Sequence, residues 1–288
     1  MKAIKLFVLS LVSAILVSCG TTSTVPITGR KQNLLVSDGE VLSLSNQQYQ
    51  QYIQSAKAST NAANTAMVKR VGQNLANAVV SYLNANGLGA EVSNYAWEFN
   101  LVQDQQVNAW CMPGGKIVVY EGLLPVTQDE GSLAIVLGHE IAHAVAKHSA
   151  ERLSNEYKSQ YGTAIVGAVL QGAGVGEGTQ QLIALGQSLG SNLWTSGFSR
   201  KQESEADHMG LIFAAMAGYD PQVATGFWQR MAAQGTGGSS LFSDHPSDET
   251  RIKNIQGWMP EALKYYKPKA TATNLPKTTK TLKITSKK

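Results

Sequence analysis

Apolar residues recur at helical spacing along much of the chain. They do so from Val41 to Tyr52 and again from Asn64 to Leu83, where Asn86-Gly87 ends the second pattern. We therefore predict two amphipathic helices in the N-terminal third. The same reasoning predicts further helices over Thr127 to about Leu153, Arg200 to Ala217, Pro221 onward, and Ser247 to Trp258.

Two short segments have the composition of β-strands. Tyr95–Val102 and Lys116–Tyr120 are rich in aromatic and β-branched residues, and Pro113-Gly114-Gly115 lies in the loop between them. We predict that the two strands form a small antiparallel sheet. The expected fold class is therefore α+β and mainly helical.

The segment from Gly162 to Gly197 differs from the rest because it holds nine glycines between short apolar stretches. This pattern predicts short helices joined by turns, an arrangement suited to a lid over a groove. A membrane hairpin is the alternative. Polar residues interrupt the apolar stretches and argue against it; they are Gln171, Glu177, Gln180 and Gln181.

The first 18 residues have the pattern of an export signal. Lys2 and Lys5 precede an apolar stretch, Leu6–Val17, that is too short to span a bilayer. The sequence Leu16-Val17-Ser18-Cys19 also resembles the lipobox of bacterial lipoproteins, which implies that Cys19 is lipidated. Acyl chains at Cys19 would anchor the protein to a membrane. The alternative is a plain secretory signal with an incidental cysteine.

The remainder divides into three parts. Residues 19–59 are expected to hold a spacer, with little order from Gly20 to about Val36, followed by a helix. Residues 60–262 form the predicted catalytic domain. Residues 263–288 form a basic tail without apolar periodicity, which predicts a disordered end; attraction to anionic lipid is the other interpretation.

Charge is distributed unevenly along the chain. The net charge of +4 depends on eight lysines beyond Glu261, whereas Gly20 to Glu261 holds 14 basic and 20 acidic residues, a net charge of about −6. This argues against nucleic-acid binding. With Cys19 used for the anchor, Cys111 has no disulfide partner, and its apolar neighbours predict a buried side chain and not a nucleophile.

The chemistry of the chain centres on His139-Glu140-Ile141-Ala142-His143. Residues four apart lie on one face of a helix, so His139 and His143 can bind one cation while Glu140 lies beside a metal-bound water. Thr127 and Glu130 have capping-box spacing at the start of this helix. A helical histidine pair without metal is the alternative.

A catalytic zinc site usually has a third protein ligand. His148 does not fit the metzincin pattern, which requires Gly at position 146 and His at 149, where this chain has Ala146 and Ser149. We therefore expect His148 at a helix end or on the surface. Glu203 and Asp207, four apart on a predicted helix, are better candidates: one carboxylate can bind zinc while the other fixes a histidine tautomer.

Together these segments resemble the zinc metallopeptidase family that contains HtpX, the type I CAAX prenyl protease and the mitochondrial Oma proteases. The matching motifs, in chain order, are Asn108-Ala109-Trp110-Cys111-Met112-Pro113-Gly114-Gly115, His139 to His143, Glu203-Ser204-Glu205-Ala206-Asp207, and His245-Pro246 with Arg251. The absence of transmembrane helices after the leader favours a lipoprotein, periplasmic branch over prenyl-protein processing.

The resemblance implies a zincin-like fold of the glutamate-ligand (gluzincin) type with one Zn²⁺ per chain. Glu203 becomes the third ligand and Asp207 supports the site. Arg251 either pairs with a site carboxylate or is a charge on the helix surface. The His-Pro motif suggests that His245 lies near the open zinc position, either stabilising an oxyanion or acting as a removable ligand; the alternative is a loop residue before the final helix. The resemblance also implies a substrate-binding edge strand, to which we assign Asn108, Ala109, Lys116, Ile117, Val118, Val119 and Tyr120.

These features predict a metalloendopeptidase that cleaves unfolded or damaged envelope proteins. Zinc would activate a water, and Glu140 would take its proton and return it to the leaving amine. The expected location is the periplasmic face of a bacterial membrane, with polypeptide substrates and envelope assembly partners. The alternative is a non-proteolytic, zinc-stabilised module that binds envelope proteins.

Overall fold

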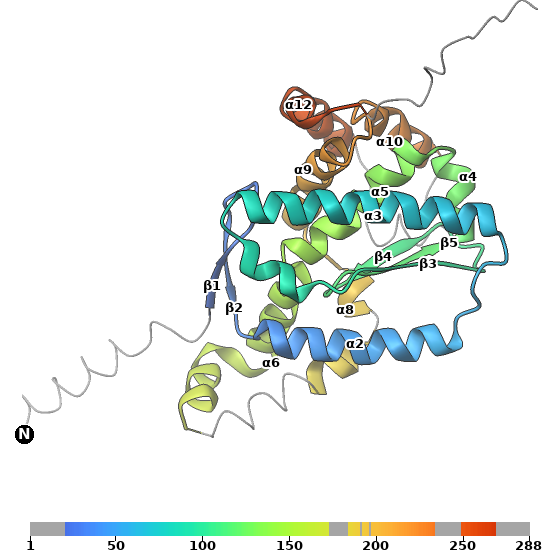
Figure 1. Cartoon of the computed structure of the whole chain (residues 1–288). Coiled ribbons are helices and arrows are strands. Elements are labelled where there is room, and N and C mark those ends of the chain that lie inside the picture. The colour runs from blue at the N-terminus through green and yellow to red at the C-terminus, as the bar shows by residue number, and fades with distance from the viewer. Residues whose placement is uncertain (1–20, 173–183, 191, 196, 234–248, 269–288) are drawn as a thin grey trace, which may run out of the picture.

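The computed structural model describes residues 21–172, 184–190, 192–195, 197–233 and 249–268 (Figure 1). The mainly helical α+β class is confirmed. The α-helices are α2 (Asp38–Ser55), α3 (Ala62–Ala85), α4 (Leu124–Thr127), α5 (Glu130–Val145), α6 (His148–Gly172), α8 (Asn192–Thr195), α9 (Arg200–Met216), α10 (Val223–Ala233) and α12 (Glu249–Tyr265). The strands are β1 (Thr21–Thr24), β2 (Lys31–Leu34), β3 (Glu98–Val102), β4 (Ala109–Met112) and β5 (Lys116–Tyr120).

The main sheet is mixed, with the strand order β3-β5-β4. The prediction that the two expected strands pair antiparallel is wrong, because β3 and β5 run parallel. The sequence pattern missed β4, which forms a hairpin with β5 through the Pro113–Gly115 turn and supplies the antiparallel pair. The four residues of β4 are all buried, so they lack the alternation of a half-exposed strand.

The sheet separates two hydrophobic clusters. Side chains that alternate along the strands point to opposite faces, so Cys111 and Ile117 pack towards α3 and α5, whereas Trp110 and Val118 pack towards α2 and α8. Figure 1 shows α3 and α5 on one side of the sheet and α2 and α8 on the other. Apolar residues of α3 fill the first cluster, as their helical spacing predicts.

Helix α5 differs at both ends from its prediction. Asp129 caps its start by accepting a hydrogen bond from the Ser132 amide at 2.6 Å, so Thr127 is not the cap. The helix ends at Val145, and Lys147 adopts a left-handed conformation with a φ of 57°. The chain therefore turns between α5 and α6, and the predicted single helix to Leu153 is wrong.

The N-terminal hairpin of β1 and β2 replaces the spacer that we expected between Gly20 and Val36. The two strands pair antiparallel, and Val25 and Leu34 are buried against the body of the protein. The Gln32 side chain donates a hydrogen bond to the Ala146 carbonyl at 2.8 Å, at the end of α5. Because this segment is polar, the sequence did not predict the hairpin, which packs beside α5.

The glycine-containing region is more helical than predicted, because α6 extends to Gly172 as one helix of 25 residues. Residues 173–183 of the expected lid lie outside the described residues. Among the helices that the structure describes, none combines the length and apolar character needed to cross a bilayer. The tail from 269 to 288 also lies outside the described residues.

Candidate metal centre

Helix α5 presents His139 and His143 on one face, one helical turn apart. Their Nε2 atoms lie 3.1 Å from each other, and each side chain is only 2% exposed. Glu140 is equally buried on the same helix. The arrangement follows from the four-residue spacing of the histidines, as predicted.

A pair of glycines brings α9 close enough to complete the cluster. A methyl group at Gly138 of α5 would lie 2.7 Å from the Gly210 carbonyl oxygen, and one at Gly210 would lie 2.6 Å from the His139 amide nitrogen. Both distances are too short for any residue with a Cβ. The two helices therefore meet backbone to backbone, which places Glu203 of α9 beside the histidines.

The carboxylate of Glu203 faces both histidines. Its Oε2 lies 3.4 Å from His139 Nε2, and its Oε1 lies 3.4 Å from His143 Nε2. One ligand atom from each of the three residues falls within 4.8 Å of the others, and the described part of the chain contains one such group.

These separations fit a zinc ion. Nitrogen and oxygen ligands at about 2.0–2.2 Å from a tetrahedral metal lie roughly 3.3–3.5 Å from each other. The three observed separations are 3.1, 3.4 and 3.4 Å. Two imidazoles and one carboxylate leave the fourth position of a tetrahedral site for water or substrate.

Asp207 orients His139 from one turn further along α9. Its Oδ1 lies 2.9 Å from His139 Nδ1, and it accepts a hydrogen bond from Arg251 of α12 at 2.6 Å. A proton on Nδ1 leaves the Nε2 lone pair directed at the metal position. Arg251 is held in turn by Trp228, whose ring centroid lies 3.4 Å from its guanidinium carbon. Asp207 and Arg251 thus lie together beside His139, while the supporting roles expected of them stay predictions.

The carboxylates beside His139 determine the direction in which its pKa shifts. Burial and the Arg251 charge lower the pKa of His139, but hydrogen bonds to Asp207 and Glu203 outweigh them and raise it to about 9. The surroundings of His139 therefore favour positive charge, which a cation at Nε2 would also supply.

His148 performs the corresponding task for His143. It lies at a helix end, one of the two positions that we predicted, but it is not on the surface. It is fully buried at the start of α6, and its Nδ1 lies 2.9 Å from His143 Nδ1. Its Nε2 lies 3.0 Å from Oε2 of Glu205. If His143 Nε2 faces a metal, its Nδ1–H must donate to His148, which then donates through Nε2–H to Glu205.

The N-terminal hairpin anchors this chain of hydrogen bonds. Arg30 donates to Glu205 at 2.8 Å and to Glu151 of α6 at 2.6 Å, and the Thr28 hydroxyl also donates to Glu205. Although burial raises the pKa of Glu205, hydrogen bonds from His148, Thr28 and Arg30 lower it to about 2. Burial lowers the pKa of His148 below its ordinary value of 6.5. These pKa shifts agree with a neutral His148 beside a charged Glu205.

Strand β4 lies next to α5, and β5 does not form the edge that we predicted. In the order β3-β5-β4, Lys116–Tyr120 is the central strand and is paired on both sides. The outer strands are β3 and β4, and β4 (Ala109–Met112), preceded by Asn108, is the one beside α5. Of the predicted edge residues, Asn108 and Ala109 therefore lie at this edge. Cys111 of this strand is buried, and burial raises its thiol pKa, as does the negative charge of Glu140. Cys111 is therefore a protonated core residue, as expected.

A cavity of about 210 Å³ leads to the metal-ligand cluster between α9 and α12. Phe198, at its border, stacks on the His143 ring at a centroid distance of 4.1 Å. Two predicted residues cannot be placed here, because Cys19 and His245 lie outside the described residues. The cavity residues are Phe198, Arg200, Glu203, Ser204, Asp207, Thr250, Arg251 and Asn254.

Sequence reasoning missed several residues that build the centre. Gly138 and Gly210 gave no signal, because only the crossing of two helices distant in sequence makes them necessary. Glu205 lies between Glu203 and Asp207 and belongs to the recognised motif, but its pairing with His148 was not predicted. Arg30 lay in a segment for which no structure was expected.

Comparison with known proteins is consistent with this geometry. The sequence profile of "Peptidase family M48" matches residues 62–259. The chain is 40% identical over 174 residues to "Mitochondrial metalloendopeptidase OMA1" of Schizosaccharomyces pombe, covering 59% of this chain and 49% of that protein. It is 30% identical over 225 residues to "Metalloprotease LoiP" of Escherichia coli, covering 78% of this chain and 82% of that protein.

A third relative is "Beta-barrel assembly-enhancing protease" of Yersinia pestis, which is 26% identical over 210 residues, covering 71% of this chain and 42% of that protein. The chain spans about half, or less, of the length of the mitochondrial relatives that it matches in fission yeast, budding yeast and Arabidopsis thaliana. Relatives thus come from both bacteria and mitochondria.

Proposed function

Because the chain belongs to peptidase family M48, we propose that it is a zinc-dependent endopeptidase that cleaves unfolded or damaged proteins of the bacterial cell envelope. One observation carries the proposal. His139, His143 and Glu203 converge within 4.8 Å, and Glu140 lies on the same helix as the two histidines. This combination of ligands and an adjacent base suits metal-assisted hydrolysis of a peptide bond.

Each residue has a defined task in this mechanism. When bound, zinc polarises the scissile carbonyl and lowers the pKa of its water towards about 7. His139, His143 and Glu203 hold the ion, while Asp207 and His148 fix the tautomers of the two histidines. Glu140 removes a proton from the attacking water and delivers it to the leaving amine.

The polypeptide would pair with the free edge of β4, by which we mean the side on which no described strand pairs with it. This strand ends the sheet, and its Cys111 side chain lies on the side of Glu140. Main-chain pairing along Ala109–Met112 requires an extended substrate, which an unfolded protein offers more readily than a folded one. This pairing by itself does not discriminate among sequences, because main-chain hydrogen bonds are common to all residues.

The envelope location rests on the leader. We place the mature chain on the periplasmic face, tethered through lipid at Cys19, because residues 16–19 resemble a lipobox. Metabolic labelling with a palmitate analogue tests this. We expect label in the wild-type protein and none in Cys19→Ala; equal labelling of the two would refute the anchor.

Casein digestion tests the peptidase itself. We expect zinc-loaded protein to cleave casein, a chelator to abolish cleavage, and added zinc to restore it. Glu140→Gln should lower the rate by about 10²–10⁴-fold, the usual contribution of a general base. Glu156→Gln, the same change at an exposed position of α6, is the matched control.

The outcomes separate the peptidase from a binding module. Absence of metal-dependent cleavage in the wild-type protein would refute the enzyme and favour a zinc-stabilised module that binds unfolded chains. A loss of activity in Glu156→Gln equal to that in Glu140→Gln would refute the role given to Glu140.

A further inference from the structure

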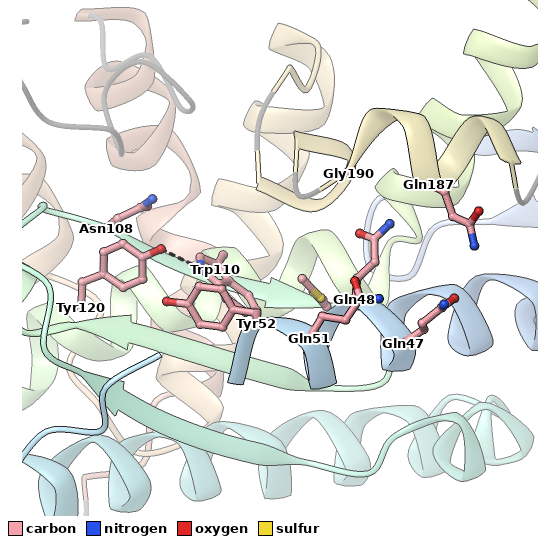
Figure 2. A pocket seen from close by; sticks show the side chains of 10 residues that line it. Gln47, Gln48, Gln51, Tyr52, Asn108, Trp110, Tyr120, Gln187 and Gly190 are labelled. Carbon is pink, nitrogen blue, oxygen red and sulfur yellow. Dashed lines mark hydrogen bonds between the residues drawn. The ribbon is translucent and has the colours of Figure 1, made fainter. Parts of the chain in front are cut away.

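A groove of about 680 Å³ lies on the face of the sheet that α2 covers (Figure 2). We call it the amide–aromatic groove. Its walls come from α2, from β4 and the end of β5, and from the segment that precedes α8. The lining residues are Gln47, Gln48, Gln51, Tyr52, Asn108, Trp110, Met112, Tyr120, Gln187 and Gly190.

The lining of this groove consists mainly of amide and aromatic side chains. None of the described residues that line it carries a charge, although the body of the chain from Gly20 to Glu261 has a net charge of about −6. Figure 2 shows three aromatic rings gathered near Asn108, with the glutamine side chains towards the other end. The rings of Tyr52 and Trp110 meet edge to face at a centroid distance of 4.9 Å.

Amide groups and aromatic rings recognise a particular kind of ligand. Each glutamine offers one acceptor and two donor hydrogens, which match the carbonyl and N–H groups of a peptide backbone and of amide side chains. The aromatic end can pack against apolar or aromatic side chains. A charged side chain would lose hydration without meeting an opposite charge, which is costly.

The groove lies across β4 from the metal centre. Trp110 and Met112 point into the groove, whereas Cys111 between them points to the face on which Glu140 lies. A polypeptide paired with the free edge of β4 would have the same alternation. Every second side chain would therefore point to the groove side while its neighbours point to the zinc side.

We propose that the amide–aromatic groove binds an uncharged segment of the polypeptide substrate, rich in amide and aromatic side chains, at a distance from the scissile bond. This inference rests on the proposed peptidase function. The free edge of β4 favours a polypeptide over other uncharged ligands, because only a polypeptide can use its main-chain groups. The groove would make cleavage selective for substrates that lack charge in the segment that it binds.

Two adjacent glutamines of α2 provide a matched test. Both side chains are exposed on the same helix, but Gln51 lines the groove and Gln50 does not. Glutamate at either position adds the same charge in the same turn of the helix. Gln51→Glu should therefore disturb the groove, while Gln50→Glu reports any general effect on charge or stability.

Binding should be measured by fluorescence anisotropy with zinc-loaded, full-length Glu140→Gln protein, so that the probe is not cleaved. One labelled 12-residue peptide carries glutamine and tyrosine at alternate positions, and a second carries glutamate in their place. We expect Gln51→Glu to weaken binding of the uncharged peptide about fivefold to tenfold, through a lost hydrogen bond and an unpaired charge. Gln50→Glu should change it less than about twofold.

Either of two results would refute the proposed role of the groove. One is unchanged binding of the uncharged peptide in Gln51→Glu, and the other is equal binding of the acidic and uncharged peptides to the parent protein. Casein assays of the otherwise wild-type chain separate this failure from failure of the peptidase. If casein is cleaved and either of these results is found, the groove proposal fails while the peptidase proposal stands. If casein is not cleaved but the uncharged peptide is bound selectively, the peptidase proposal fails while the groove still binds the uncharged segment.

Discussion

Replacing His148 by phenylalanine should weaken zinc binding by roughly 10–100-fold, the range typical of residues that orient a metal ligand. Phenylalanine keeps the shape of the ring but cannot accept the hydrogen bond from His143 Nδ1–H, which spans 2.9 Å to His148 Nδ1. His148 is fully buried, so no solvent water can take its place.

The magnitude follows from the polar group that is left unpaired. A buried donor without an acceptor costs about 1–3 kcal/mol, which corresponds to a factor of about 5–150 in an equilibrium constant. His143 can avoid this cost by rotating its ring, but Nε2 then leaves the position 3.4 Å from Glu203 that suits a shared metal. In both cases zinc binding loses free energy.

Competition with a chromophoric zinc chelator measures the affinity without any need for peptidase activity. His208→Phe is the matched control, because His208 pairs with Glu261 at 2.7 Å and is not part of the metal-ligand cluster. His148→Asn should recover much of the affinity, since its carbonyl oxygen can accept from His143 at the position of Nδ1. Zinc affinity of folded His148→Phe within twofold of wild type would refute the role given to His148.

Two further substitutions test how the centre is assembled. Gly210→Ala should lower the free energy of unfolding by about 1–3 kcal/mol, because its methyl group would lie 2.6 Å from the His139 amide nitrogen. Gly257→Ala is the control, because a methyl group there would meet nothing within 4 Å beyond the adjoining backbone of α12, and it should raise the free energy of unfolding by about 0.5–1 kcal/mol. If urea unfolding gave effects of the same sign for the two variants, the close helix crossing would be contradicted. Arg30→Met should cost about 2–3 kcal/mol at pH 7 by removing a partner of Glu205. The pKa of Glu205 in the folded protein is lowered to about 2, so its contribution to stability is fully present above the ordinary carboxyl pKa. That contribution is lost as the pH falls towards 2. An Arg30→Met effect on stability that is equal at pH 7 and pH 3 would therefore contradict this pairing.

The sequence alone was sufficient where the chemistry is local. The spacing of His139 and His143 requires a helix to direct both rings to one point, and α5 supplies it. The apolar periodicity of α3 likewise predicted its buried face. Glu203 was reached by its four-residue relation to Asp207 together with family resemblance.

What escaped prediction depends on contacts between distant segments. The left-handed Lys147 separates α5 from α6 and places His148 behind His143, which no helical periodicity indicates. The predicted edge strand wrongly included Lys116–Tyr120 beside Asn108 and Ala109, because the uniformly buried β4 has no alternating pattern. The hairpin carrying Arg30 is polar, and its order depends on carboxylates more than 100 residues away in the chain.

Anomalous diffraction at the zinc edge, from crystals of the zinc-loaded full chain, tests directly whether His139, His143 and Glu203 hold the catalytic metal. We expect a single strong peak per chain, about 2.0–2.2 Å from Nε2 of each histidine and from a carboxylate oxygen of Glu203. A principal peak elsewhere, or one at the two histidines with Asp207 or Glu205 as the third ligand in place of Glu203, would contradict the proposed centre.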